Sequence, residues 1–196
     1  MPTGVHIRDA RQQLFDAAER VLLRDGASAL TSRAVTAEAG VAKGVLHRHF
    51  ADFDAFLAEL VQDRLNRMTD QSAALRASAG TGTVTDTLTT ALTELFDPVA
   101  VAIVGLVIFR DELRARLGRG QGIPVLAEAA AMFAGYLAEE RALGRIAADA
   151  DVDSLALSLI GSGHLLFADR ANRPDPVALG QVVETVLADA VQRRLL

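Results

Sequence analysis

The sequence contains no cysteine, and it holds only four histidines in 196 residues. The lack of cysteine excludes disulfide bonds, thiolate nucleophiles and cysteine-based zinc sites together, because each needs a cysteine sulfur atom. The few histidines do not combine with other side chains into a nucleophile–base pair or a metal-ligating group. We therefore predict no cofactor, no metal and no enzymatic activity.

The sequence also lacks a long apolar run. The longest one, residues 99–109, is bounded by Pro98 and Arg110, and it is shorter than the ~20 residues that a helix needs to cross a bilayer. The first residues do not show the basic and then apolar pattern of a secretory signal. We expect residues 99–109 to form a buried helix, the chain to have no membrane partner, and the protein to be cytoplasmic.

Aromatic residues make up only 5% of the sequence and tryptophan is absent, although 51% of the residues are hydrophobic. The core must then consist mainly of alanine, leucine and valine, and the first two favour helices. Apolar residues recur at helical spacing, and no useful length alternates with the period of a strand. This pattern predicts an all-α fold of about nine helices. They are expected to cover residues 7–25, 31–39, 42–49, 53–78, 84–96, 98–117, 123–142, 152–170 and 176–195.

The formal net charge of −5 is unevenly distributed. Residues 1–50 carry seven basic and five acidic side chains, whereas the rest of the chain carries 13 basic and 20 acidic ones. A mildly basic segment on an acidic body favours an N-terminal surface that faces nucleic acid.

Residues 30–50, LTSRAVTAEAGVAKGVLHRHF, contain the clearest motif. Two short helices joined by a turn that contains Gly40 predict a helix-turn-helix, in which glycine allows the positive φ of the bend. Four apolar residues can hold the two helices at a fixed angle: Val35, Ala39, Val41 and Leu46. The second helix then presents short or polar side chains outward, as insertion into a major groove requires.

This segment and its flanks resemble the DNA-binding domain of the TetR (tetracycline-repressor-like) family over residues 8–60. The matching residues occur in the family's order and spacing: Asp25-Gly26, Leu30-Thr31, Ala39-Gly40-Val41, Lys43-Gly44, Leu46 and Phe50. The resemblance implies a helix-turn-helix DNA-binding domain in residues 1–52 and a helical domain for effector binding and dimerisation in residues 53–196. It implies a transcriptional regulator, by default a repressor, that a small-molecule effector releases from a palindromic operator in double-stranded DNA.

Nine residues stand where the family contacts DNA: Thr31, Ser32, Arg33, Lys43, Gly44, Val45, His47, Arg48 and His49. The first three would meet the phosphate backbone, which sets register and affinity. Lys43 would bind guanine or phosphate, and Val45 would touch a thymine methyl group. The last three would reach phosphates and neighbouring bases.

Three residues depart from the family pattern. His47 replaces a common tyrosine, and Thr36 replaces a common alanine in the packed second helix. Phe53 stands where a phosphate-binding lysine commonly opens the fourth helix, so one charged contact with DNA is expected to be missing.

The resemblance also implies a homodimer, in which the last two long helices of each protomer form a four-helix bundle. The predicted interface residues are Leu157, Gly161, Leu165, Ala168, Val182, Val183, Val186 and Leu187. The predicted effector pocket consists of Phe96, Phe109, Met132, Phe133, Tyr136, His164 and Phe167. A lining with few charges favours a hydrophobic or aromatic ligand.

Simpler interpretations of these residues stay open. His47 and His49 are also typical of a solvated surface, His164 is typical of a hydrogen-bonded core histidine, and the aromatic residues are typical of plain core packing. Two other functions remain as alternatives. An all-helical small-molecule-binding enzyme would need a catalytic constellation that the sequence does not show, and a helical adaptor without DNA binding would leave the polar surface of residues 43–49 without a role.

Overall fold

The computed structural model describes residues 10–118, 123–169 and 173–191. These residues form ten α-helices, one short 3-10 helix and no strand, which confirms the all-α prediction. The helices are α1 (Ala10–Asp25), η1 (Ala27–Ala29), α2 (Ser32–Glu38), α3 (Gly44–His49), α4 (Phe53–Ala77), α5 (Val84–Leu95), α6 (Pro98–Ile108), α7 (Asp111–Leu117), α8 (Pro124–Ala142), α9 (Val152–Phe167) and α10 (Pro176–Leu187).

The largest differences from the predicted helix boundaries are at residues 98–117 and at the end of the last helix. The single helix expected over residues 98–117 is divided into α6 and α7, because Arg110 adopts an extended conformation between them. The last helix ends at Leu187 rather than 195, because residues 188–190 turn and Ala190 accepts a hydrogen bond from the backbone N–H of Ala147 at 2.7 Å. The predicted residues 192–195 and the predicted first-helix residue Ile7 lie outside the described part of the chain.

The positions of the helix starts follow from capping side chains. In each case a side-chain oxygen accepts a hydrogen bond from a backbone N–H of the first turn, which would otherwise lack a partner. The capping residues are Thr31 in α2, Asp52 in α4, Thr83 in α5, Asp97 in α6, Asp151 in α9 and Asp175 in α10.

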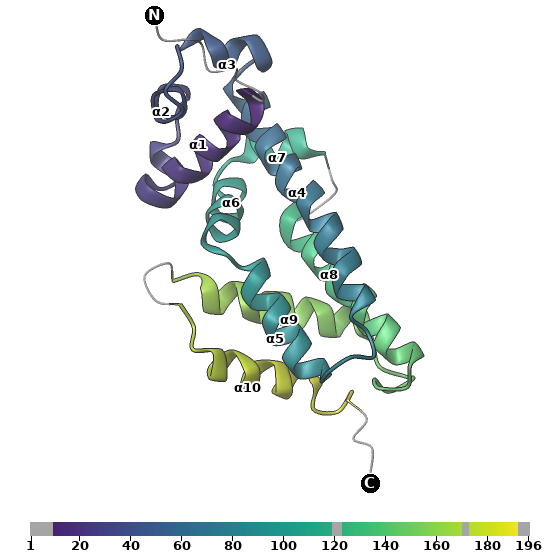
Figure 1. Cartoon of the computed structure of the whole chain (residues 1–196). Helices are drawn as coiled ribbons and strands as arrows, with labels where there is room; N and C mark the ends of the chain where they lie inside the picture. Colours follow the sequence, from purple (N-terminus) through teal and green to yellow (C-terminus); the bar gives the residue numbers. More distant parts are fainter. Residues whose placement is uncertain (1–9, 119–122, 170–172, 192–196) are drawn as a thin grey trace, which may run out of the picture.

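The helices form an elongated molecule with two ends (Figure 1). Helices α1, α2 and α3 lie together at one end, and α4 runs from them along the length of the molecule. Helices α5, α9 and α10 lie at the other end, where α10 packs on α5 and α9, while α8 packs on α4 and α9. Helix α4 therefore connects the helix-turn-helix segment with the rest of the chain.

The core is mainly aliphatic, as the composition predicts. Most residues of α6 are buried, which agrees with the predicted buried helix except at Phe109, which follows the helix and is exposed. Within the described residues no single helix combines the length and apolar character needed to cross a membrane. Helices α5 and α6 meet that criterion only as a pair, and they are bent by 64° at the break between them.

A half-buried ion pair joins α4 to α6 near the middle of the molecule. Arg64 of α4 is buried, and its guanidinium pairs with the carboxylate of Asp97. The same carboxylate accepts hydrogen bonds from the backbone N–H groups of Val99 and Ala100 at 2.8 and 2.9 Å. Asp97 thus starts α6 and holds it against α4.

We expect Asp97→Ala to lower the free energy of unfolding by about 2 kcal/mol or more, since it removes a helix cap and leaves a buried guanidinium without its partner. Asp97→Asn is the control. It keeps a cap acceptor and loses only the negative charge, so it should cost about half as much. Urea unfolding followed by circular dichroism measures both, and equal losses for the two variants would contradict the assigned double role.

Candidate functional site

Residues 30–50 fold into the predicted pair of short helices. Thr31 caps α2 by accepting a hydrogen bond from the N–H of Ala34 at 3.1 Å. Gly40 forms the turn with a φ of +67°, a conformation that side chains with a Cβ rarely adopt. Helix α3 begins at Gly44, two residues later than predicted.

Aromatic packing fixes the position of α3. The ring of Phe50, directly after α3, lies 5.8 Å from Phe15 of α1 and 5.0 Å from Phe56 of α4. Phe15 and Phe56 are themselves 5.6 Å apart, and Leu46 of α3 is fully buried beside this cluster. The rings of Phe15, Phe50 and Phe56 thus hold α1, α3 and α4 together. We call these three residues the aromatic junction.

Arg11 covers the aromatic junction from outside. Its guanidinium carbon lies 4.7 Å from the centroid of the Phe50 ring, a cation–π contact. The same group donates to the backbone oxygen of His49 at 3.4 Å and pairs with Glu59 of α4. Sequence reasoning counted Arg11 only as one basic residue among several, because these partners are distant along the chain.

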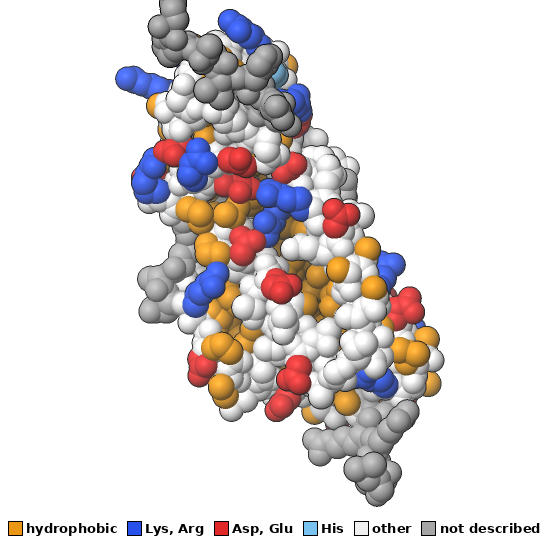
Figure 2. Space-filling view, in the orientation of Figure 1, with side chains coloured by type: hydrophobic (Ala, Val, Ile, Leu, Met, Phe, Trp, Pro, Cys, Tyr) orange, Lys and Arg blue, Asp and Glu red, His pale blue; other side chains and the backbone are white. Residues whose placement is uncertain are grey.

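The nine residues predicted to contact DNA lie on α2, on α3 and in the turn between them. Seven are exposed: Thr31, Arg33, Lys43, Gly44, His47, Arg48 and His49. Ser32 and Val45 are half-buried, and the hydroxyl of Ser32 has no hydrogen-bond partner among the described residues. Figure 2 shows basic side chains projecting at this end of the molecule.

The basic residues of this end fall into two groups. Arg20 and Arg24 of α1 each donate to Glu38 at 2.8 Å, and these bonds hold the pKa of the Glu38 carboxyl below its usual value, with Arg20 the larger cause. Arg33, Lys43 and Arg48 have no ion-pair partner among the described residues. These three residues are called the unpaired cations below, because their charges are available to an anion outside the protein.

The start of α4 is anchored to α7. Asp52 accepts from the N–H of Ala55 at 2.6 Å and from the guanidinium of Arg116 at 2.9 Å. The backbone bond, and secondly Arg116, lower the pKa of the Asp52 carboxyl. Arg110 adds a looser pair with Asp54 at 3.8 Å. The first turn of α4 therefore contacts both the helix-turn-helix and α7.

The predicted pocket residues do not gather in one cavity. Phe109 is 84% exposed at the end of α6, so its prediction as a pocket residue is wrong. Phe133 and Tyr136 are core residues, and the Tyr136 hydroxyl donates to Glu140 at 2.7 Å. Burial, and secondly this hydrogen bond, raise the pKa of Tyr136. Met132 lines a cavity between α4 and α5.

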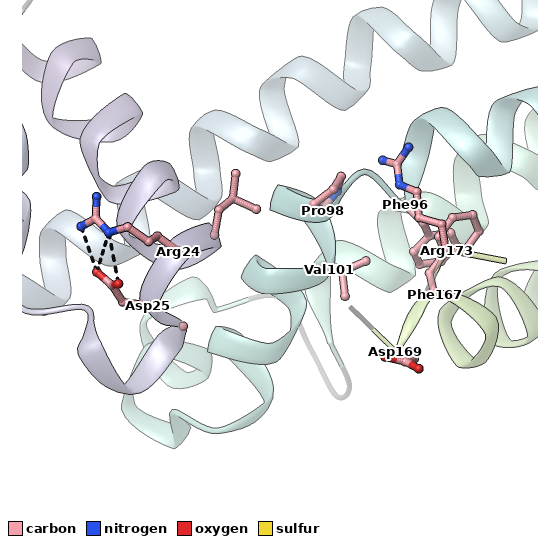
Figure 3. Close-up of a pocket in the computed structure, with 10 residues that line it drawn as sticks. Arg24, Asp25, Phe96, Pro98, Val101, Phe167, Asp169 and Arg173 are labelled. Carbon is pink, nitrogen blue, oxygen red and sulfur yellow. Dashed lines mark hydrogen bonds and ion pairs between the residues drawn. The ribbon is translucent and has the colours of Figure 1, made fainter. Parts of the chain in front are cut away.

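The described residues form several cavities that are large enough for a small molecule, and two of them are lined in part by predicted pocket residues. The α4–α5 groove, of about 460 Å³, is lined by Gln71, Ala74, Leu75, Ser78, Asp86, Thr87, Thr90, Ala91, Glu94, Leu95 and Met132. The α1–α9 pocket, of about 470 Å³, is lined by Leu23, Arg24, Asp25, Gly26, Phe96, Pro98, Val101, Phe167, Asp169 and Arg173. Figure 3 shows the latter, with Arg24 and Asp25 on one side and Phe96, Phe167 and Arg173 on the other.

The predicted aromatic residues Phe96 and Phe167 stack in the α1–α9 pocket, with centroids 5.4 Å apart. His164 lies next to them, its ring 6.3 Å from that of Phe96. It does not line either cavity.

The predicted dimer residues of α9 and of α10 differ in exposure. On α9, Gly161 and Ala168 are exposed, and Leu157 and Leu165 are 67% and 76% exposed. On α10, Val182 and Val186 are half-buried. Val183 and Leu187 face the protomer's own core and are fully buried there, so the prediction that they form a dimer surface is corrected.

Residues 14–60 match the family model described as bacterial regulatory proteins, tetR family. No curated protein matches the chain. The solved structure of reduced NemR from E. coli gives a TM-score of 0.75 at 15% identity, over 95% of this chain and 100% of NemR.

FadR from Bacillus subtilis, solved with stearoyl-CoA, gives a TM-score of 0.70 at 20% identity over 90% of this chain and 97% of FadR. SmeT, the repressor of the Stenotrophomonas maltophilia efflux pump SmeDEF, gives 0.66 at 19% identity over 96% of this chain and 94% of SmeT. At these identities the likeness shows a shared fold.

Two glycines of the helix-turn-helix provide a matched test of the turn. A Cβ added at Gly40 or at Gly44 meets no atom within 4 Å, but only Gly40 has a positive φ. We expect Gly40→Ala to destabilise the fold by about 1 kcal/mol or more through backbone strain. Gly44→Ala should be neutral or stabilise it by up to about 1 kcal/mol, because alanine favours a helix. Thermal unfolding distinguishes the two, and equal shifts would contradict the assigned turn.

Proposed function

We propose that this chain, a member of the TetR family of bacterial regulatory proteins through its residues 14–60, is a sequence-specific repressor that a small, largely apolar ligand releases from its operator. The observation that carries the proposal is the presence of three unpaired cations on the exposed surface of α2 and α3. The charges of Arg20 and Arg24 on α1 are balanced by carboxylates of the protein. The unpaired cations, in contrast, can replace the counterions that surround DNA phosphates.

The exposed face of α3 is the part that would enter a major groove. Lys43 and Val45 lie at its start, where Lys43 can bind a guanine or a phosphate and Val45 can contact a thymine methyl group. Thr31, Ser32 and Arg33 at the start of α2 would bind the phosphate backbone, and the hydroxyl of Ser32 is still without a partner. His47, Arg48 and His49 would reach neighbouring phosphates and bases.

A homodimer would present two copies of α3 to one operator. Leu157, Gly161 and Leu165 form an exposed stripe along α9, and α10 packs beside this helix. Exposed leucines of this kind are typical of a surface that a partner covers. A two-fold axis near α9 and α10 would pair the stripes, and a palindromic site with half-sites ~34 Å apart would follow.

The fold supports a division of the chain into two functional parts. Residues 1–52 would bind DNA in the cytoplasm, and residues 53–196 would bind the effector and the partner protomer. The α4–α5 groove is the proposed effector site, because α4 forms one of its walls and also carries Phe56 of the aromatic junction. A ligand that fits the groove better in one orientation of α4 would shift the population toward it. No step of this proposal requires catalysis.

Lys43 tests the proposed contact with DNA. On an operator selected from random double-stranded DNA, we expect Lys43→Gln to make the dependence of log K on log salt less steep by about 1.8, since a dimer loses two phosphate contacts. Arg20→Gln is the control, because it removes the same charge from a residue that Glu38 already neutralises. Fluorescence anisotropy at several salt concentrations gives both slopes. Equal slopes for the two variants would contradict the proposed contact of Lys43 with DNA.

Leu165 tests the proposed dimer. We expect Leu165→Glu to yield a monomer in light scattering and to weaken operator binding on the order of 10²-fold or more, because the two half-sites are then bound independently. Leu143→Glu is the control, since Leu143 is 54% exposed but lies at the end of α8. A dimeric Leu165→Glu variant would contradict the interface on α9.

A further inference from the structure

The α4–α5 groove has negative charge and no positive charge in its lining. Asp86 and Glu94 of α5 are its charged residues, and both are exposed. The floor is apolar and includes Leu75, Leu95 and Met132, all buried. In Figure 2, hydrophobic side chains lie in the hollow between α4 and α5, next to acidic ones. An anionic ligand would be repelled here, so the lining favours an apolar body with a positive group.

The two carboxylates differ in what the fold requires of them. Asp86 has a structural role, because the hydroxyl of Thr83 donates to its carboxylate at 2.6 Å and its own N–H donates to Thr83 Oγ1 at 3.1 Å. This reciprocal pair resembles a capping box at the start of α5. Glu94 makes no hydrogen bond or ion pair with any described residue. Its carboxylate is therefore available to a ligand.

Gln71 of α4 adds a second unsatisfied acceptor to the residues that line the groove. Gln71 Oε1 is buried and accepts no hydrogen bond from the described residues, although Gln71 lines the same groove. Buried carbonyl oxygens nearly always have a donor, so this atom marks a place where one is missing. An ammonium group carries three N–H donors and a positive charge, which are what the Gln71 oxygen and the Glu94 carboxylate lack.

We propose that the α4–α5 groove binds an organic monocation, a protonated amine on an aliphatic or aromatic body. The amine binds Glu94 and Gln71, and the body covers the apolar floor formed by Leu75, Leu95 and Met132. This inference rests on the proposed function, in which the groove is the effector site. The α1–α9 pocket differs in charge, because Arg24 and Arg173 stand in its lining beside two aspartates.

The test uses two probes of the same size on the full-length protein. At neutral pH 4-phenylbutylamine is a cation, whereas 4-phenyl-1-butanol is neutral. By isothermal titration calorimetry we expect the amine to bind about fivefold to tenfold more tightly than the alcohol. Glu94→Gln should remove this preference by weakening the amine alone. Glu112→Gln makes the same change at an exposed carboxylate of α7 outside the groove and should leave both affinities unchanged.

A second pair of variants locates the binding site. Ala74 is exposed and lines the groove, so Ala74→Trp fills it without entering the core and should abolish binding of both probes. Phe167→Ala opens the α1–α9 pocket and should leave binding unchanged. Equal affinities of amine and alcohol, an unchanged preference in Glu94→Gln, or loss of binding in Phe167→Ala but not in Ala74→Trp would each overturn the inference.

Operator binding separates this inference from the proposed function. If the protein binds its operator but does not prefer the amine, the ligand class is wrong and the regulator assignment is unaffected. If the amine binds with the expected preference but no operator can be selected, the regulator assignment fails and the ligand class of the groove holds. Release of the operator by the amine, lost in Glu94→Gln, supports both.

Discussion

The aromatic junction determines where the exposed surface of α3 lies. Helix α3 has only six residues, and a helix of this length has no stable orientation of its own. Phe50 provides that orientation, because its ring is held between Phe15 of α1 and Phe56 of α4. Arg11 closes the cluster and also bonds the last residue of α3. One of the three rings belongs to α4, so the position of α3 depends on the position of the first turns of α4.

The helix-turn-helix could be predicted from the sequence because its determinants are local. The Thr31 cap, the positive φ of Gly40 and the inward position of Leu46 lie within sixteen residues of one another, and the structure has all three. The break between α6 and α7 could not be predicted this way. Arg110 and Arg116 around that break pair with Asp54 and Asp52, which lie more than fifty residues earlier. Phe109 was placed in the pocket because helical periodicity continues across a break set by distant contacts.

The cavity and the dimer surface were harder to predict for another reason. Aromatic residues were expected to line the effector pocket, but most of them fill the core. The α4–α5 groove, which is the proposed effector site, has polar and acidic side chains such as Gln71 and Glu94 above an apolar floor. The sequence positions of such residues do not predict a shared cavity, because the residues belong to different helices. On α10 the valines at 182, 183 and 186 cover more than one face, so periodicity alone does not tell which of them point inward.

Regulation under the proposed function would depend on α4 acting as a lever. The groove lies at one end of α4, around residue 74, and Phe56 lies at the other, while the Arg64–Asp97 pair holds the helix between them. At 1.5 Å per residue, the two arms are roughly 15 and 12 Å long. A tilt that moves α4 at the groove therefore moves Phe56 by a similar distance in the opposite direction. Phe56 contacts Phe50 at the end of α3, so this movement would also shift α3. A coupling free energy of 1–3 kcal/mol, typical of two linked sites, would then change the affinity for DNA about 5- to 150-fold.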